Sequence, residues 1–330
     1  MKINKINIGI IGLGVGFKHY KNLKNNKYCI INSVCDFDKK KLDQIKDEKI
    51  IKTKNSKLIT SSKDVNLVII CSYDNYHFQH VCESINNNKH VFVEKPFCMN
   101  SKELKIIKEI LKRKKNIKIG TNLHLKHAPQ FQILNKKIKN KQFGNIYHFS
   151  GEYNYSRYYK LQYGWRGKIN YYSVLLGGAI HLIDIMVNNL GDNIAKVMAI
   201  GNKIASSKKK FKHYDFVTCL IKFKKPDIIA KITANFGSNG PHNHYLRIDG
   251  TKQTFVQNFP DQIYFTGKDN NFKMIKSKIK KNEYYIKIYI DKFIDEIVLN
   301  KKNNTKNIFK VLEIIFALEE SLEKERWIGL

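Results

Sequence analysis

The segment GIIGLGVGFKHY, residues 9–20, constrains the fold more than any other stretch of the chain. It places three glycines, Gly12, Gly14 and Gly16, within five positions, directly after an apolar run at 6–11. Glycine has no Cβ, so such a turn lets backbone N–H groups approach a pyrophosphate at a helix N-terminus. The segment therefore predicts a strand, a phosphate-binding turn and a helix. The spacing is one residue shorter than G-x-G-x-x-G, so we expect Gly16 to act as the third glycine and Phe17 to face the strand–helix interface.

An acidic residue follows the second apolar run at the position that a dinucleotide site requires. Asp36 lies 24 residues after Gly12, where a carboxylate binds the ribose hydroxyls of a bound cofactor. Because this carboxylate would repel a 2′-phosphate, the sequence favours NAD over NADP, although the lysines at 39–41 weaken that preference. The alternative is a structural turn with a solvated aspartate.

The first 120 residues alternate short apolar runs with amphipathic segments, and this alternation is typical of a doubly wound parallel sheet. Asn100 and Glu103 form a capping box that opens the last helix of the series. We therefore expect a dinucleotide-binding domain over residues 1–121. The predicted strands are 6–11, 28–35, 67–71, 90–93 and 117–121, and the predicted helices lie near 17–25, 38–47, 77–88 and 101–115.

After residue 122 longer alternating strands replace the βα pattern, which predicts a second, α+β domain over 122–330 with a mostly antiparallel sheet. An irregular loop is expected between about 155 and 172. The predicted helices are 127–141, 178–190, 284–299 and 306–325, and the predicted strands are 146–155, 194–201, 214–223, 228–236, 245–257 and 261–266.

The net charge of +32 raises the question of nucleic-acid binding. Only five of the 60 basic residues are arginines, and the lysines are spread along the whole chain. Base readout favours the planar guanidinium fork, which lysine lacks, so we expect no specific nucleic-acid partner. Weak, salt-sensitive adhesion to polyanions stays open as an alternative.

The remaining composition points to a cytoplasmic protein. No run reaches the roughly 18 to 20 apolar residues of a membrane span, and no signal peptide is recognisable. The six cysteines form no C-x-x-C pair and are expected to be buried free thiols. Four further histidines have no metal-ligand spacing, so no metal is predicted. These are His124, His127, His242 and His244.

The segment KHVFVEKPFCMN, residues 89–100, suggests a chemical function. Lys95 stands at the carboxyl end of a predicted parallel strand, where ligands of open α/β sheets bind. Pro96 restricts Lys95 to an extended conformation, and Glu94 can orient its ammonium group. For an isolated E-K-P the alternative is an ordinary surface lysine.

The E-K-P is not isolated, because GLGVG, the strand ending at Asp36, CSYDNYHFQHV (71–81), E-K-P and GGAIHLID (177–184) occur in this order. The chain thereby resembles the Gfo/Idh/MocA oxidoreductases over essentially its whole length, with NLHLKHAPQF (122–131) as the hinge. The resemblance implies an N-terminal Rossmann domain and a C-terminal open sheet that carries a homo-oligomer interface, in a dimer or tetramer. It also implies hydride transfer with a nicotinamide cofactor.

The resemblance assigns catalysis to Lys95 and His181, where the imidazole exchanges the hydroxyl proton. Many family members carry an aspartate four residues before this histidine, but here that position is Gly177. Asp184, three residues after His181, is a structural substitute at most. The expected cofactor-binding residues are Gly12, Gly14, Val15, Gly16, Phe17, Asp36, Ser72, Tyr73, Asn75, His77, Glu94, Lys95 and Asn122.

The segment at 151–173 is dense in tyrosine and carries two of the five arginines. Aromatic faces stack on sugar rings and arginines bind carboxylates or phosphates, so we expect the substrate to be a sugar, polyol or nucleotide-sugar. The alternatives are an interface or core-covering loop here, and a catalytically silent dinucleotide-binding sensor or scaffold for the whole chain. The expected substrate-binding residues are Tyr153, Tyr155, Arg157, Trp165, Arg166 and His181.

Overall fold

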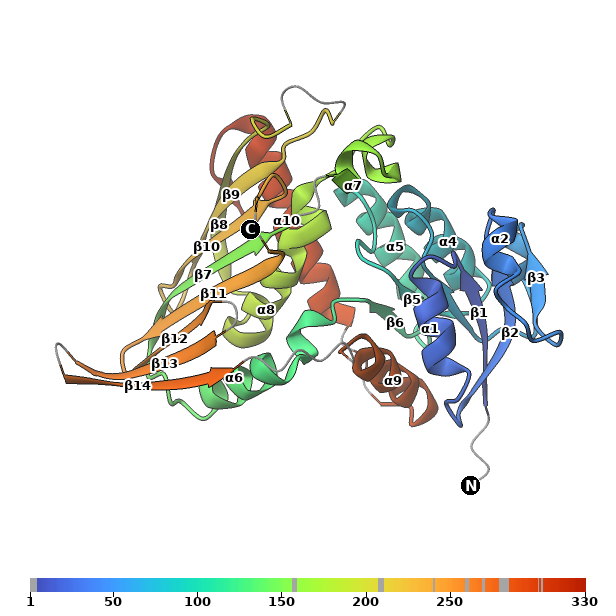
Figure 1. Ribbon diagram of the computed structural model, residues 1–330, viewed down its shortest axis with the longest axis horizontal. Coiled ribbons are helices and arrows are strands. Elements are labelled where there is room, and N and C mark those ends of the chain that lie inside the picture. Colours follow the sequence, from blue (N-terminus) through green and yellow to red (C-terminus); the bar gives the residue numbers. More distant parts are fainter. Residues whose placement is uncertain are drawn as a thin grey trace. The chain divides into compact units, whose positions relative to one another are not determined.

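The structure is a computed structural model, shown as a ribbon in Figure 1. It describes residues 5–155, 159–206, 211–239, 241–258, 261–268, 271–278, 285–301, 303 and 305–330. The chain forms two compact units. The first consists of residues 1–124 and 284–309, and the second of residues 125–283 and 310–330.

The first unit is built on a parallel sheet of six described strands in the order β3-β2-β1-β4-β5-β6. Every residue of β4 is buried, as expected for a strand covered on both faces. The predicted Rossmann fold is confirmed. The strands are β1 (Ile6–Ile11), β2 (Cys29–Cys35), β3 (Ile51–Thr53), β4 (Leu67–Ile70), β5 (His90–Val93) and β6 (Ile119–Thr121).

The helices of this unit follow the prediction except around residues 38–60. The helix predicted at 38–47 ends at Leu42, and a separate turn follows in which Asp47 Oδ1 accepts a hydrogen bond from Lys49 N at 3.0 Å. The sequence did not predict β3 or α3 (Lys57–Thr60), because three and four residues are too few to show a periodic pattern. Asn100 caps α5 as predicted, accepting from Glu103 N at 2.9 Å. The helices are α1 (Gly16–Leu23), α2 (Lys39–Leu42), α3 (Lys57–Thr60), α4 (Asp74–Asn86) and α5 (Ser101–Arg113).

A helix from near the end of the chain completes the core of the first unit. Ile290, Phe293 and Ile294 of α9 (Tyr285–Val298) are buried in the same cluster as Phe92 of β5. A Cβ at Gly120 would lie 3.0 Å from the Phe293 ring, so the helix packs closely on β6. The sequence pattern places this segment in the second domain, whereas its apolar face packs in the core of the first unit.

The second unit contains a mixed sheet of nine described strands in the order β14-β13-β12-β11-β7-β10-β9-β8-β15. Only β7 and β10 pair in parallel. The single strand predicted at 245–257 is wrong, because a turn after Gly250 divides it into the hairpin β11–β12. The strands are β7 (Ile146–Asn154), β8 (Ile194–Asn202), β9 (Phe216–Phe223), β10 (Ile229–Asn235), β11 (Asn243–Gly250), β12 (Gln253–Asn258), β13 (Asp261–Lys268), β14 (Asn271–Lys278) and β15 (Ile328–Gly329).

Two helices cover one face of this sheet. Leu182 of α8 (Ile180–Leu190) lies 3.2 Å from where a Cβ of Gly151 would be, and Ser321 of α10 (Thr305–Lys324) accepts from Ala199 N at 3.0 Å. On the opposite face, Leu220 is 39% exposed, so described helices leave it uncovered. The other helical segments are α6 (Pro129–Lys139), α7 (Tyr159–Gln162), the 3-10 turns Leu125–His127 and Trp165–Gly167, and the π-helical turn Leu175–Ala179.

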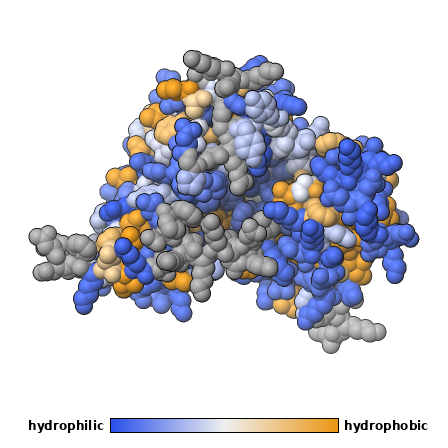
Figure 2. Space-filling view, in the orientation of Figure 1, coloured by the Kyte–Doolittle hydropathy of each residue, from blue (hydrophilic) through white to orange (hydrophobic). Residues whose placement is uncertain are grey.

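The visible surface is mostly hydrophilic, with small hydrophobic patches scattered over it (Figure 2). This distribution agrees with the lysine-rich composition. Among the described residues, no helix combines the length and the apolar character that a membrane crossing requires.

Candidate active site

The glycine turn follows β1, and its three glycines differ in backbone conformation and in the space around them. Gly12 has φ +88°, and a Cβ there would lie 2.7 Å from Ser72 N. A Cβ at Gly16 would lie 3.0 Å from Ile10 Cγ2, so Gly16 provides the close approach of α1 to β1. No described atom lies within 4 Å of the corresponding position at Gly14. The backbone conformation and the neighbouring chain thus require glycine at position 12, Gly16 allows close packing of the helix, and Gly14 leaves open space beside the turn.

The N-terminus of α1 faces this turn without a side-chain cap. Val15 is the N-cap residue, is 41% exposed and has no polar side-chain atom that could cap the helix. The first turn contains no acidic residue. Because unpaired N–H groups and the helix dipole favour anions, this end suits a phosphate. Phe17 lies against the apolar core and stacks on Tyr20, with ring centroids 5.8 Å apart.

Asp36 follows β2 and braces the glycine turn. Its Oδ2 accepts a hydrogen bond from Leu13 N at 2.7 Å, and its Oδ1 accepts from Asp38 N at 2.9 Å. Lys41 Nζ lies 3.5 Å from Oδ2. A carboxylate has about four acceptor positions, so these contacts leave room for a ribose hydroxyl. Lys41 adds a positive charge beside Asp36, and this charge would attract the 2′-phosphate of NADP.

Two buried histidines hold the loop after β4. His77 is fully buried, with Nε2 3.0 Å from Ser72 O and Nδ1 2.7 Å from Pro96 O, so its ring connects this loop to the E-K-P. His80 Nδ1 lies 3.1 Å from Ser72 Oγ, and burial lowers the His80 pKa to about 4. His77 therefore braces the two loops from inside the protein.

Tyr73 and Asn75 are the outer residues of the same loop. Tyr73 is half-buried and lies edge-on to Phe37, with ring centroids 5.8 Å apart. Asn75 is exposed in the first turn of α4. Phe37 directly follows Asp36, so these side chains lie beside the expected ribose position.

Glu94 and Lys95 follow β5, and Glu94 is held on two sides. Its Oε1 accepts from Asn122 Nδ2 at 2.7 Å and lies 3.1 Å from His19 Nε2. Burial by itself raises the pKa of Glu94, but the hydrogen bonds from His19 and Asn122 outweigh it, so the pKa lies below its ordinary value. The carboxylate before Lys95 is therefore ionised at neutral pH. Lys95 is partly exposed.

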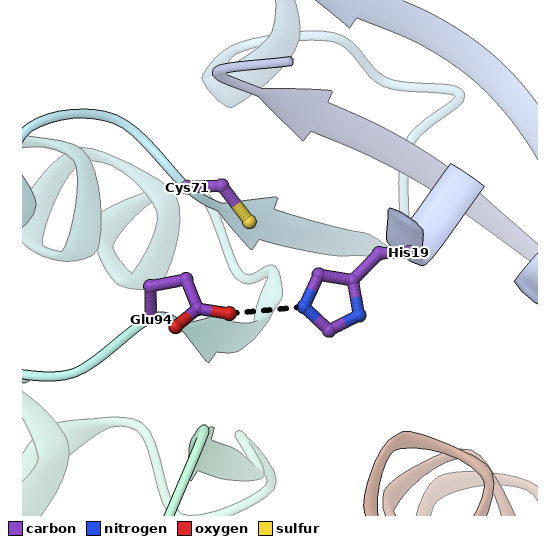
Figure 3. A group of neighbouring side chains, drawn as sticks. All are labelled: His19, Cys71 and Glu94. Atoms are coloured by element: carbon purple, nitrogen blue, oxygen red, sulfur yellow. Dashed lines mark hydrogen bonds and ion pairs between the residues drawn. The ribbon is translucent and has the colours of Figure 1, made fainter. Parts of the chain in front are cut away.

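Figure 3 shows His19 and Glu94 joined by this contact, with Cys71 beside them. Their potential ligand atoms all lie within 4.8 Å of one another, as a metal site would require. Burial raises the pKa of the Cys71 thiol well above its ordinary value, and Glu94 raises it further. A metal needs the thiolate, so the trio is better described as a His–Glu pair beside a neutral thiol. His19 was not predicted as a site residue. Its only signal in the sequence is that a histidine stands in the first turn of the helix after the glycines.

The strand order brings these groups to one edge of the sheet. β1, β4 and β5 are neighbours, and the order reverses between β1 and β4. The carboxyl ends of parallel strands meet at the same edge, and ligands of doubly wound sheets bind at this switch point. The first unit thus collects the glycine turn, the Ser72 loop and the E-K-P around one position.

In the second unit, aromatic side chains surround His181. The His181 ring in α8 is 5% exposed and stacks on Tyr153 of β7, with centroids 6.2 Å apart. Tyr153 also contacts Tyr155, Phe236 and His244, at centroid distances of 6.1, 5.8 and 4.9 Å. The structure thereby brings Tyr153, Tyr155 and His181 together, and adds Phe236, directly after β10, and His244 of β11, neither of which was predicted to bind substrate.

The remaining predicted substrate residues lie in the 3-10 turn Trp165–Gly167. The Arg166 guanidinium lies over the Trp165 ring at 4.5 Å and is 6.0 Å from the Tyr172 ring. Both Trp165 and Arg166 are partly exposed. Arg157 lies outside the described residues.

The position that departs from the family pattern, Gly177, is filled by another side chain. A Cβ there would lie 2.9 Å from Tyr172 Cζ and still closer to its hydroxyl oxygen. Asp184 does not take over this position, because it forms an ion pair with Lys126 at 2.8 Å. Burial raises the pKa of Asp184, and Lys126 opposes that shift.

Two protein-family models match this chain. Residues 6–122 match the model described as "Oxidoreductase family, NAD-binding Rossmann fold", and residues 131–256 match the "GFO/IDH/MocA C-terminal domain". The chain is 28% identical over 141 residues to myo-inositol 2-dehydrogenase of Thermotoga maritima, a match that spans 42% of each chain. The chain therefore spans less than half the length of that curated relative.

Two solved structures share the fold over nearly the whole chain. Levoglucosan dehydrogenase in complex with NADH and levoglucosan has a TM-score of 0.86 at 19% identity, covering 99% of both chains. Scyllo-inositol dehydrogenase from Lactobacillus casei, with bound NAD(H) and scyllo-inositol, has a TM-score of 0.81 at 19% identity and the same coverage. The two family matches together span most of the chain, so it belongs to the Gfo/Idh/MocA oxidoreductase family and carries that family's NAD-binding Rossmann fold.

Proposed function

We propose that this oxidoreductase is an NAD(H)-dependent dehydrogenase that interconverts a secondary alcohol and a ketone on a cyclic polyol or sugar. The observation that carries the proposal is the position of Lys95, whose strand ends at the same sheet edge as the glycine turn. An ammonium group there lies beside the expected cofactor position. The names of the inositol and levoglucosan dehydrogenases support the substrate class.

The cofactor is assigned to the turn after β1. The open space beside Gly14 and the uncapped start of α1 at Val15 fit a pyrophosphate. Asp36 is assigned to the adenosine ribose, which favours NAD, with NADP as the weaker ligand. The bound nicotinamide would supply the hydride acceptor or donor.

Lys95 and His181 are assigned complementary parts of the reaction. The Lys95 ammonium donates a hydrogen bond to the reacting oxygen and stabilises its developing alkoxide charge. The His181 imidazole accepts the hydroxyl proton during oxidation and returns it during reduction. Tyr153 and Tyr155 offer apolar faces for the ring of the substrate, and Trp165 and Arg166 offer a further aromatic face and a cation.

The test begins with NADH binding, followed by fluorescence, and continues with NAD⁺ reduction in the presence of myo-inositol, scyllo-inositol or levoglucosan. We expect binding and turnover of at least one of these compounds. NADH binding without turnover of any polyol or sugar would favour the second candidate, a catalytically silent dinucleotide-binding protein. The replacement of the family aspartate by Gly177 is the observation that favours this candidate.

We also propose a homo-oligomer formed through the second unit. The sheet face opposite α8 and α10 exposes Leu220 and Ile229, which are 39% and 50% accessible. Partly apolar, uncovered sheet faces are suited to self-association. Light scattering at micromolar concentration should give a dimer or tetramer, and a monomer would contradict this proposal.

A further inference from the structure

A polar pocket lies in the first unit, at the edge of the sheet opposite the glycine turn. It has a volume of about 690 Å³, and its walls come from the start of β5, the segment between α5 and β6, the end of α9 and the start of α10. The described residues that line it all belong to the first unit. We propose that this pocket binds a small phosphorylated sugar or polyol, as a second ligand distinct from the cofactor.

The strand directions separate this pocket from the expected cofactor position. His90, the first residue of β5, and Lys118, directly before β6, both line it, so it lies at the amino ends of these strands. The glycine turn and Lys95 instead follow the carboxyl ends of β1 and β5. The four residues of β5, at about 3.3 Å each, separate the two edges by roughly 13 Å. A ligand in this pocket therefore leaves the cofactor position open.

The charged groups of the pocket are all positive. Lys115, Lys118 and Lys301 line it, and none of the described lining residues is acidic. Lys118 is partly buried, and its Nζ donates a hydrogen bond to the backbone oxygen of Lys301. An ammonium group has three donors, so Lys118 can also donate to a phosphate oxygen, and such charge-assisted hydrogen bonds are strong. The pocket therefore favours an anion.

Lysines close to helix ends can also act by neutralising C-terminal carbonyl groups. Lys114, which directly precedes the lining segment, acts in this way, because its Nζ donates to Asn86 O at the end of α4 at 3.2 Å. Lys115 and Lys301 differ from it, since their exposed side chains line the pocket from two separate segments. Their charges are therefore available to a ligand that enters between these segments.

The uncharged lining groups suit a hydroxylated ligand. Asn116 and Asn300 supply amide groups and Thr305 supplies a hydroxyl group. Amide and hydroxyl groups both donate and accept hydrogen bonds, as sugar hydroxyls do. Pockets for small organic ligands commonly enclose about 300–1,000 Å³, so this one has room for a sugar carrying phosphate groups. A single phosphate ion would leave much of it unfilled.

Hydrogen bonds between the walls hold the pocket in shape. Asn303 Nδ2 donates to Glu296 Oε2 of α9 at 2.7 Å, and Asn303 Oδ1 accepts from Ile119 N of β6 at 3.4 Å. The Lys118 contact joins the same two walls a second time. His90 Nδ1 accepts from Lys118 N at 3.0 Å, which fixes the segment before β6 on β5. Such a preformed pocket loses little entropy when a ligand binds.

The first experiment measures binding to the full-length protein by isothermal titration at about 0.15 M salt, where diffuse surface attraction is screened. We expect fructose 1,6-bisphosphate to bind with a Kd below about 1 mM. Pyrophosphate, which carries phosphate groups without hydroxyls, should bind more weakly. Absence of binding by fructose 1,6-bisphosphate would overturn the inference, and equal affinity for pyrophosphate would overturn its sugar part. The Kd for NADH should be unchanged by saturating fructose 1,6-bisphosphate, whereas competition would show that the two share a site.

The second experiment separates the pocket from the general charge of the protein, which is +32. Lys115→Ala/Lys301→Ala should weaken binding of fructose 1,6-bisphosphate by about tenfold or more, through the loss of two charge-assisted contacts. Lys46→Ala/Lys49→Ala is the matched control, because it removes the same charge at exposed positions outside the pocket. An equal loss of affinity in both variants would show unspecific attraction and overturn the inference. All four positions are exposed, so both variants should keep the Tm of the wild type.

The third experiment locates the ligand. Arg166→Ala, in the second unit, should keep the wild-type Kd for fructose 1,6-bisphosphate, whereas a loss of affinity there would place the phosphate at the expected substrate residues and overturn the inference. A crystal of the protein with this compound should show it between Lys118 and Thr305. Binding at this pocket is measured without turnover. A protein that oxidises no polyol would therefore contradict the proposed function and leave this inference to be decided by these titrations.

Discussion

The two units hold their candidate site residues by different means. In the first, short segments at successive strand ends position them, and backbone groups such as Leu13 N and Pro96 O provide many of the contacts. In the second, side chains from distant parts of the chain surround His181, including Tyr153 of β7 and Phe236 after β10. The cofactor half thus depends on the course of the chain, and the substrate half depends on the packing of side chains.

The largest expected effect compares one residue from each unit. Lys95→Ala should lower turnover by about 10²- to 10³-fold, as for loss of a preorganised donor. His181→Ala should lower it by roughly 10²- to 10⁴-fold and remove a limb of the pH–rate profile near neutrality. Steady-state kinetics measures both effects, and NADH titration should show unchanged affinity. Lys102→Ala, at an exposed position on α5, is the control. Near-wild-type turnover in Lys95→Ala would refute the proposed mechanism.

The next comparison separates folding from binding within the glycine turn. Gly12→Ala should lower Tm, because φ +88° and the nearby Ser72 N leave no unstrained place for a methyl group. Gly14→Ala should leave the Tm of the free protein unchanged, because no described atom lies within 4 Å of the new methyl. It should weaken NADH binding by about tenfold, or about 1.4 kcal/mol, by obstructing the phosphate. Thermal melts with and without NADH distinguish the two; equal NADH affinity in Gly14→Ala would contradict the site.

Asp36 tests the cofactor preference. Asp36→Ser should narrow the difference between NAD(H) and NADP(H) affinities by roughly 1 to 3 kcal/mol, because a repelling carboxylate is removed while Lys41 remains. Isothermal titration with both cofactors measures the change. Asp38→Ser is the control, since Asp38 caps α2 through Lys40 N and serine is also a good N-cap. Equal affinities of the wild type for the two cofactors would remove the basis of the assignment.

The smallest effect concerns acid stability of the first unit. Burial lowers the pKa values of His80 and His90 to about 4. The unfolded chain binds these protons near pH 6.5, so the free energy of unfolding should fall as pH decreases from 6.5 towards 4. The loss is about 1 kcal/mol per histidine at pH 5.5. His90→Asn keeps an acceptor for Lys118 N. Denaturant titrations at several pH values should show a smaller slope of the unfolding free energy against pH, because one proton fewer is taken up on unfolding. An unaltered slope would contradict the buried neutral state.

The sequence predicted the first unit well because its signals are local. The apolar run, the glycines and Asp36 each predict structure only within a few positions along the chain. Parallel pairing of the strands then brings the carboxyl ends of these strands to one edge of the sheet. His19 was missed because its contact with Glu94 joins residues 75 positions apart. The residue type is visible in the segment, but its partner is not.

The second unit was less predictable for the same reason. The helix containing His181 and most strands were recognisable in the sequence, but the turn after Gly250 was not. A single glycine occurs both in turns and within continuous strands, so it does not predict which of the two forms. Tyr172 fills the space beside Gly177, and its neighbour Ser173 donates a hydrogen bond to Glu319, 146 residues away. No periodicity records such a contact. Only the absence of the family aspartate indicated that something else fills its place.

The return of α9 to the first unit has a consequence for synthesis and dissection of the protein. Ile290, Phe293 and Ile294 complete the core around Phe92, but the ribosome adds them only after nearly all of the second unit has emerged. Until α9 has been synthesised, the core of the first 124 residues is incomplete, and the apolar surface that α9 covers stays exposed to solvent. A fragment that ends at residue 124 should therefore be aggregation-prone and poorly soluble. Fusing residues 284–309 to this fragment through a flexible linker should restore its solubility.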